Sequence, residues 1–211
     1  MTTRVKVCGI TNLEDALAAL EAGADMLGFN FYARSPRRVS PSEARRVVER
    51  LPAGVECVGV FVNESAPAGV ERVARESGVG AVQLHGAETH EFCRALRGLT
   101  TIKALRVGPD FTPESAAAYP TDAVLLDAYV AGEWGGTGHT FDWSLARLTR
   151  EAVPRLFLAG GLKPENVAAA VAAVRPFAVD VCSGVETSPG RKNPRLIRGF
   201  VEIVKEVDSS Q

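Results

Sequence analysis

The sequence predicts a single (β/α)8 barrel (a TIM barrel) that spans residues 1–211, and three observations support this prediction. Short apolar segments of strand-like composition alternate with segments that carry helix start signals, and eight such pairs follow one another along the chain. Eight units close a barrel of this type, and 211 residues lie within its usual size range. No linker or low-complexity stretch divides the chain. A doubly wound parallel sheet is the alternative fold.

The first half of the chain contains four of the expected units. The strand at 4–8 runs directly into Gly9-Ile10-Thr11-Asn12, where a glycine stops the strand and a cap residue can start a helix. Ser40-Pro41-Ser42-Glu43 opens the second helix with a cap, a proline at the first position and an early acid. The other expected elements are strands at 24–31, 55–62 and 81–85, with helices at 66–76 and 88–96.

The second half repeats the pattern. Strands are expected at 100–107, 122–127, 155–159 and 177–182, with helices at 113–118, 142–148, 164–174 and 194–207. The glycine-rich segment 133–143 is long for a connection between a strand and a helix, and such loops are usually functional or disordered. Residues 208–211 are expected to form a frayed tail.

The composition indicates a soluble protein without a nucleic-acid or membrane partner. Hydrophobic residues make up 46% of the chain and charged residues 23%, and a net charge of -1 does not favour nucleic acid or an anionic membrane surface. There is no signal region and no apolar run near the ~18 residues that cross a bilayer, so a cytoplasmic location is expected. Four scattered cysteines and three histidines lack the spacing of a disulfide framework or a zinc site.

Candidate catalytic residues stand where predicted strands end, because ligands of parallel α/β sheets and barrels bind at that edge. Cys8 ends the first strand, although a free cysteine is more often a small buried hydrophobe. Asp127 ends the sixth strand, where a partly desolvated carboxyl group can hold a proton for a leaving oxygen or simply cap a turn. His85 is an acid, a base or a hydrogen-bonding wall residue, and Asp180 needs a partner if it is buried.

Candidate binding residues lie in three loops. Gly160-Gly161 follows the seventh strand and Ser183-Gly184 follows the eighth, and in barrels these two loops often bind phosphate through backbone N–H groups. Arg37 follows the second strand, where a guanidinium suits the capture of a carboxylate, although three arginines in five positions are most often a solvated face.

Seven short segments in this order resemble phosphoribosylanthranilate isomerase of tryptophan biosynthesis, and the resemblance covers nearly the whole chain. The segments are Val7-Cys8-Gly9-Ile10-Thr11, Phe31-Tyr32 with Ser35-Pro36-Arg37, Val82-Gln83-Leu84-His85-Gly86, Leu126-Asp127, Gly135-Gly136-Thr137-Gly138 with Phe141-Asp142-Trp143, Ala159-Gly160-Gly161-Leu162, and Val179-Asp180-Val181-Cys182-Ser183-Gly184-Val185-Glu186.

This resemblance implies a (β/α)8 barrel that catalyses an Amadori rearrangement of a small phosphosugar without cofactor or metal. It implies that Asp127 is the general acid and Cys8 the general base. Arg37 would hold the anthranilate carboxylate, and the backbone at 160–161 and 183–184 would hold the phosphate, with Asp180 also facing substrate. A monomer or a homodimer is expected, with no nucleic-acid or membrane partner.

The chain departs from the family pattern at a few positions. His139 stands where lysine is also common and Cys182 where serine is frequent, so neither is assigned a special role. Two other hypotheses stay open. A histidine-pathway aminoaldose isomerase would need aspartates in both the acid and the base positions, and Cys8 argues against it. A phosphosugar-binding module that has lost its chemistry would bind ligand without turnover.

Overall fold

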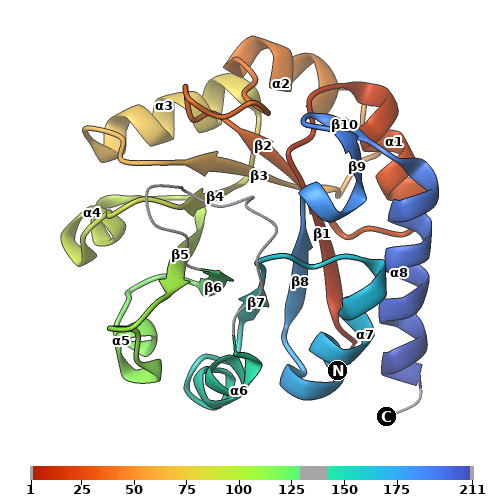
Figure 1. Cartoon of the computed structure of the whole chain (residues 1–211). Coiled ribbons are helices and arrows are strands. Elements are labelled where there is room, and N and C mark those ends of the chain that lie inside the picture. Colours follow the sequence, from red (N-terminus) through yellow and green to blue (C-terminus); the bar gives the residue numbers. More distant parts are fainter. Residues whose placement is uncertain (1, 129–141, 210–211) are drawn as a thin grey trace.

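The computed structural model describes residues 2–128 and 142–209, and within them eight parallel strands form a closed barrel. The strands follow one another around the barrel in chain order, and β8 pairs with β1 to close it. Helices surround the strands on the outside (Figure 1). The (β/α)8 barrel predicted from the sequence is therefore confirmed, and the doubly wound alternative is wrong, because an open sheet would leave β1 and β8 unpaired.

The elements alternate along the chain as expected. The strands are β1 Arg4–Cys8, β2 Met26–Asn30, β3 Glu56–Phe61, β4 Ala81–Leu84, β5 Thr100–Val107, β6 Ala123–Ala128, β7 Leu156–Leu158 and β8 Ala178–Val181. The helices are α1 Leu13–Glu21, α2 Pro41–Val48, α3 Pro67–Ser77, α4 His90–Ala95, α5 Pro113–Ala117, α6 Trp143–Ala152, α7 Pro164–Val174 and α8 Pro194–Ser209.

The helix start signals act as the sequence predicts. Asn12 caps α1 by accepting a hydrogen bond from the backbone of Asp15. Ser40 and Glu43 form a reciprocal capping box at α2, with Pro41 at the first helical position. These local bonds satisfy backbone N–H groups that the first helical turn would otherwise leave unpaired.

Alternating residues of each strand point into the barrel or out toward the helices. On β1, Val5 and Val7 belong to the outer core between barrel and helices. Lys6 and Cys8 have the opposite parity and therefore face the interior. The interior is filled by a separate apolar cluster that includes Met26, Leu125 and Phe157. The barrel is thus a packed core rather than a pore, and only its ends are available for ligands.

Three features differ from the sequence predictions. Strands β2, β3, β7 and β8 are shorter than predicted at both ends, β4 ends one residue earlier, and β6 is shifted by one residue. The chain after β8 forms a short 3-10 helix, η1 Ser183–Val185, and a two-stranded antiparallel hairpin, β9 Glu186–Ser188 and β10 Arg191–Lys192, which the sequence analysis does not predict. Helix α8 continues to Ser209, so Asp208 and Ser209 are helical rather than part of a frayed tail.

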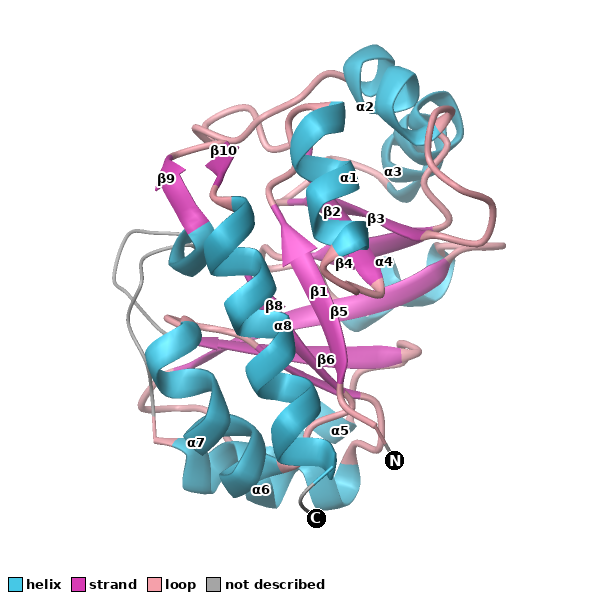
Figure 2. Cartoon of the chain, turned by 90° about the vertical axis from the view of Figure 1, so that its right-hand side faces the viewer, coloured by secondary structure: helices cyan, strands magenta, loops and turns pink. Residues whose placement is uncertain are grey.

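The reason for the longer helix is a contact between the two ends of the chain. The carboxylate of Asp208 accepts hydrogen bonds from Thr3, including one of 2.9 Å from its hydroxyl group. Both termini lie at the same end of the molecule, and α8 runs along the outside of β1 (Figures 1 and 2). No helix in the described parts of the chain is long and apolar enough to cross a membrane.

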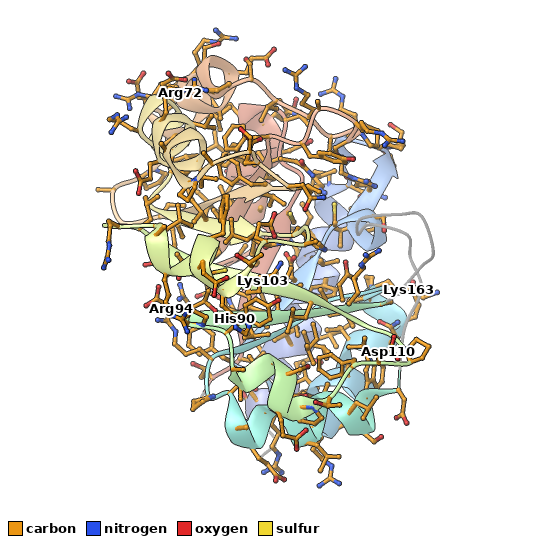
Figure 3. All side chains as sticks on the ribbon, turned by 90° about the vertical axis from the view of Figure 1, so that its left-hand side faces the viewer. Arg72, His90, Arg94, Lys103, Asp110 and Lys163 are labelled. Carbon is orange, nitrogen blue, oxygen red and sulfur yellow. The ribbon has the colours of Figure 1, made fainter. Side chains whose placement is uncertain are left out.

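A buried ion pair fixes the connection between β4 and α4. The ammonium group of Lys103 on β5 donates hydrogen bonds to Glu88 at 2.8 Å and to the backbone oxygens of Leu84 and Gly86. Figure 3 labels Lys103 together with His90 and Arg94 of α4. Because Glu88 also accepts hydrogen bonds from backbone N–H groups of two loops, this pair holds the ends of β3, β4 and β5 in place around the barrel mouth.

Candidate functional site

The pocket that contains the predicted site residues lies at the mouth of the barrel, where the carboxyl ends of the strands meet. Its volume is about 260 Å³. Asp110 and Lys163, labelled in Figure 3, follow β5 and β7 at this end of the molecule. Of the eight residues proposed from the sequence, all but Gly184 line the pocket: Cys8, Arg37, Asp127, Gly160, Gly161, Asp180 and Ser183.

Cys8 is the last residue of β1 and its thiol is buried in the pocket wall. A hydrogen bond with the side chain of Cys182 lowers the pKa of Cys8. Burial opposes this effect, and the positive charges of Lys6 and Lys192 lower the pKa further. The net result is a pKa well below the ordinary thiol value, so that the thiolate, the form that accepts a proton, is accessible.

The other cysteines behave differently. All four are free. Burial raises the pKa of Cys57 to about 11, and burial also raises the pKa of Cys93. The hydrogen bond with Cys8 raises the pKa of Cys182 well above its ordinary value. Cys8 is therefore the one cysteine of the chain whose surroundings favour the thiolate.

Asp180 has the partner that its burial requires. The carboxylate receives a hydrogen bond of 2.9 Å from the ammonium group of Lys6, which is its direct neighbour in the β1–β8 pairing. Burial raises the pKa of Asp180 to about 6, and the positive charge of Lys6 limits this rise. Asp180 thus combines a structural ion pair with a position on the pocket wall.

Asp127 faces the barrel interior near the carboxyl end of β6, and two contacts hold its side chain. One carboxylate oxygen, Oδ1, accepts a hydrogen bond of 2.8 Å from the backbone N–H of Ala128. The other, Oδ2, lies 3.1 Å from Nε2 of His85, whose Nδ1 lies 2.8 Å from the amide nitrogen of Gln83. His85 therefore lies on the pocket wall and links Gln83 to Asp127, and these contacts fix the direction of the carboxyl group.

Arg37 is paired within the protein. Its Nε and Nη2 groups donate hydrogen bonds of 2.8 to 3.1 Å to both carboxylate oxygens of Glu186. Glu186 also receives a hydrogen bond of 2.8 Å from Lys192 on β10. These bonds orient the guanidinium at the pocket rim and occupy part of its donor set, so a bound carboxylate has to share Arg37 with Glu186.

The two glycine-containing loops meet beside the pocket. Gly160 and Gly161 both have positive φ angles, at 85° and 63°, which side chains rarely adopt. A Cβ atom at Gly160 would lie 2.6 Å from the backbone nitrogen of Ala128, and one at Gly184 would overlap the carbonyl oxygen of Leu162. Gly184 therefore allows close contact between the loops after β7 and β8, although it does not itself line the pocket.

Several residues of this site were not predicted from the sequence. They are Cys182, Lys6 and Lys192, which surround Cys8, and Glu186, which holds Arg37. One signal is visible in the sequence: Lys6-Val7-Cys8 and Asp180-Val181-Cys182 have the same spacing and belong to strands that must be neighbours in a closed barrel. The glycine-rich segment 133–141 and His139 lie outside the described residues.

No group of three or more histidine, cysteine or acidic side chains in residues 2–128 and 142–209 is arranged to hold a metal ion. What these residues do present is a set of charged and proton-transferring groups around one cavity at the carboxyl ends of eight barrel strands. This arrangement defines the class as a (β/α)8-barrel protein with its ligand site at the strand ends.

Comparison with known proteins gives the family. The sequence profile of N-(5'phosphoribosyl)anthranilate (PRA) isomerase matches residues 5–203. The N-(5'-phosphoribosyl)anthranilate isomerase of Trichlorobacter lovleyi is 50% identical over 203 residues, which cover 96% of this chain and 98% of that protein. The enzyme of Thermotoga neapolitana is 49% identical, with coverage of 96% and 98%. The chain belongs to the phosphoribosylanthranilate isomerase family and is an isomerase of that family.

Solved structures agree with this placement. The phosphoribosyl anthranilate isomerase of Thermotoga maritima superposes with a TM-score of 0.90 at 47% identity, covering 97% of this chain and 100% of that one. A second structure, at 46% identity, the same coverage and a TM-score of 0.87, is a phosphoribosyl anthranilate isomerase in complex with reduced 1-(o-carboxyphenylamino)-1-deoxyribulose 5-phosphate.

Proposed function

We propose that this chain converts N-(5-phosphoribosyl)anthranilate to 1-(2-carboxyphenylamino)-1-deoxyribulose 5-phosphate in tryptophan biosynthesis, with Asp127 as general acid and Cys8 as general base. The observation that carries the proposal is the placement of both residues on the wall of one pocket, from the non-adjacent strands β6 and β1. A substrate between them can receive a proton from one side and lose a proton to the other.

In the first step Asp127 gives its proton to the ring oxygen of the ribose. The ring C–O bond breaks, its electron pair goes to that oxygen, and a Schiff base forms between the opened sugar and the anthranilate nitrogen. The carboxylate that remains on Asp127 is stabilised by the N–H group of Ala128 and by His85, when Nε2 carries the ring proton.

In the second step the thiolate of Cys8 removes the proton from C2' of the Schiff base. The C–H electron pair moves into the conjugated system and produces an enolamine, which tautomerises to the ketone product. The lowered pKa of Cys8 supports this role, because a larger share of the thiol is in its basic form near neutral pH.

The remaining predicted residues bind the two ends of the substrate. Arg37 holds the anthranilate carboxylate with the donors that Glu186 leaves available. Backbone groups of Gly160, Gly161, Ser183 and Gly184 hold the phosphate, as expected for the loops after strands seven and eight of such a barrel. Asp180 lines the same pocket and faces the substrate.

The experiment that tests this proposal measures turnover of wild type, Cys8→Ala and Asp127→Asn as loss of anthranilate-conjugate fluorescence, with substrate generated in place. Each variant should fold, as judged by far-UV circular dichroism, and lose at least ~100-fold in rate. Cys57→Ala serves as the control, because Cys57 lies on β3 and its thiol belongs to the outer core between barrel and helices. An inactive wild type that still binds the phosphosugar would favour the binding-module hypothesis instead.

A further inference from the structure

Cys182 stands directly beside Cys8 at the barrel mouth. Val7 on β1 pairs with Val181, the last residue of β8. The residues that follow them, Cys8 and Cys182, therefore lie side by side. The valines face the outer core and the cysteines face the pocket. The side chain of Cys182 lowers the pKa of its neighbour Cys8, and Cys8 in turn raises the pKa of Cys182.

Two glycine residues leave the space that the sulfur atoms of Cys8 and Cys182 occupy. A Cβ atom at Gly28 on β2 would lie only 2.7 Å from the sulfur of Cys8. A Cβ atom at Gly9 would lie 3.0 Å from the sulfur of Cys182. Each sulfur therefore packs directly against a neighbouring backbone, and the space that it occupies exists because those two positions have no side chain.

Four charged groups act directly on the thiol pair: Lys6 on β1, Arg37 after β2, Asp180 on β8 and Lys192 on β10. Two further carboxylates act on these groups, Asp127 on Asp180 and Glu186 on Arg37 and Lys192. The three cations contact carboxylates at 2.8 to 2.9 Å, Lys6 with Asp180 and the other two with Glu186. Every cation near the sulfurs thus also has an anionic partner, and the neighbouring thiol acts together with these cations on which sulfur keeps the proton.

Lys192 connects Cys182 to this network. Its Nζ atom lies 3.1 Å from the backbone oxygen of Cys182 and 3.8 Å from the sulfur. Lys6 lies two residues before Cys8 on the same face of β1 and is fully buried. One negative charge shared by two sulfurs between two ammonium groups is thus stabilised, whereas two charges in this buried site are not.

We propose that Cys182 is a positioning residue for the base: its S–H group donates a hydrogen bond to the sulfur of Cys8 and keeps Cys8 as the thiolate. The inference rests on the proposed role of Cys8 in the reaction. During the second step Cys8 takes the proton from C2', the C–H electron pair stays with the substrate, and Cys182 retains its own proton throughout. Cys182 touches no reacting atom and acts only through Cys8.

The first test measures the thiol itself and needs no substrate. The rate of Cys8 alkylation by iodoacetamide is followed against pH by mass spectrometry of the Cys8 peptide, with a phosphine reductant present until the reagent is added. The midpoint is the pH at which the alkylation rate is half its maximum. In Cys182→Ala and Cys182→Val, which lack the donor, this midpoint should rise by about one to two pH units, the value of a hydrogen bond to a charged group. Cys182→Ser keeps a donor and should stay close to wild type.

The second test follows the acidic limb of kcat/KM against pH in the same variants. The limb should move upward in Cys182→Ala and Cys182→Val and stay in place in Cys182→Ser and in the control Cys57→Ala. Alkylation midpoints equal to wild type in both donor-free variants would overturn the proposal. If the midpoints shift but Cys8→Ala keeps full turnover, the hydrogen bond stands and the assignment of Cys8 as base fails.

Discussion

The guanidinium of Arg37 has more hydrogen-bond donors than its partner Glu186 uses. The bonds to Glu186 involve Nε and Nη2, and they lock the side chain in one direction at the pocket rim. A planar group with five donors can hold a structural carboxylate along one edge and present its remaining donors to a second carboxylate. The proposed role of Arg37 in binding the anthranilate carboxylate depends on sharing its donors between Glu186 and the substrate.

We therefore expect Arg37→Lys to weaken substrate binding more than it slows chemistry. A lysine ammonium cannot bridge Glu186 and a second carboxylate with the same geometry, so KM should rise about 10- to 100-fold while kcat changes much less. Steady-state kinetics of the isomerase reaction measure both constants. Arg38→Lys is the matched control, because Arg38 belongs to the same loop but is exposed and does not line the pocket. An unchanged KM in Arg37→Lys would refute the carboxylate assignment.

At the scale of the elements, strand periodicity made much of the site predictable. Cys8 and Asp127 could be identified because an inward-facing residue at a strand's carboxyl end must lie at the barrel mouth, whichever strand carries it. Local helix signals were equally informative, as at Ser40 and Glu43 of α2. Both kinds of inference use only neighbouring residues, and they therefore need no knowledge of distant contacts.

Long-range partners could not be predicted in this way. Glu186 and Lys192 lie on the β9–β10 hairpin, whose position depends on contacts across the chain, such as the hydrogen bond of 3.0 Å from the backbone of Lys192 to Asp15. The link from Gln83 through His85 to Asp127 likewise crosses from β4 to β6. The register between β1 and β8 would have placed Cys182 beside Cys8, but this register can be used only once the barrel is taken to be closed.

The close contact between the loops after β7 and β8 leads to a testable prediction. A Cβ atom at Gly184 would overlap the carbonyl oxygen of Leu162, so Gly184→Ala should push η1 away from the loop that carries Gly160 and Gly161. We expect at least ~10-fold weaker binding of the phosphate-bearing product, and a loss of about 1–3 kcal/mol in the free energy of unfolding from overpacking. Calorimetric titration and urea denaturation measure these two quantities.

Gly199→Ala on α8 is the matched control for this substitution, because a Cβ atom there would meet no other atom within 4 Å. That variant should bind product like wild type and be slightly more stable, since alanine favours a helix interior. If Gly184→Ala binds product normally, the loops do not depend on their close approach, and the proposed phosphate site must lie elsewhere.

At the scale of the whole molecule, closure of the barrel unites groups that are far apart in the chain. β8 returns to β1, and this pairing brings Asp180 to Lys6 and Cys182 to Cys8. The same closure places β6 away from β1 across the mouth, so that Asp127 and Cys8 face one cavity without direct strand pairing. The fold thus separates the proposed acid from the proposed base. The monomeric or dimeric state of the chain stays a prediction.

A kinetic isotope effect distinguishes the roles proposed for Asp127 and Cys8. The substrate is prepared from ribose deuterated at C2, and the effect on kcat/KM is measured for wild type, Cys8→Ala and Asp127→Asn. Removal of the base slows C2'–H cleavage, so the isotope effect of Cys8→Ala should exceed that of wild type. Removal of the acid slows ring opening, so the effect of Asp127→Asn should fall toward unity. The reverse pattern, or equal effects in both variants, would contradict the roles assigned to Cys8 and Asp127.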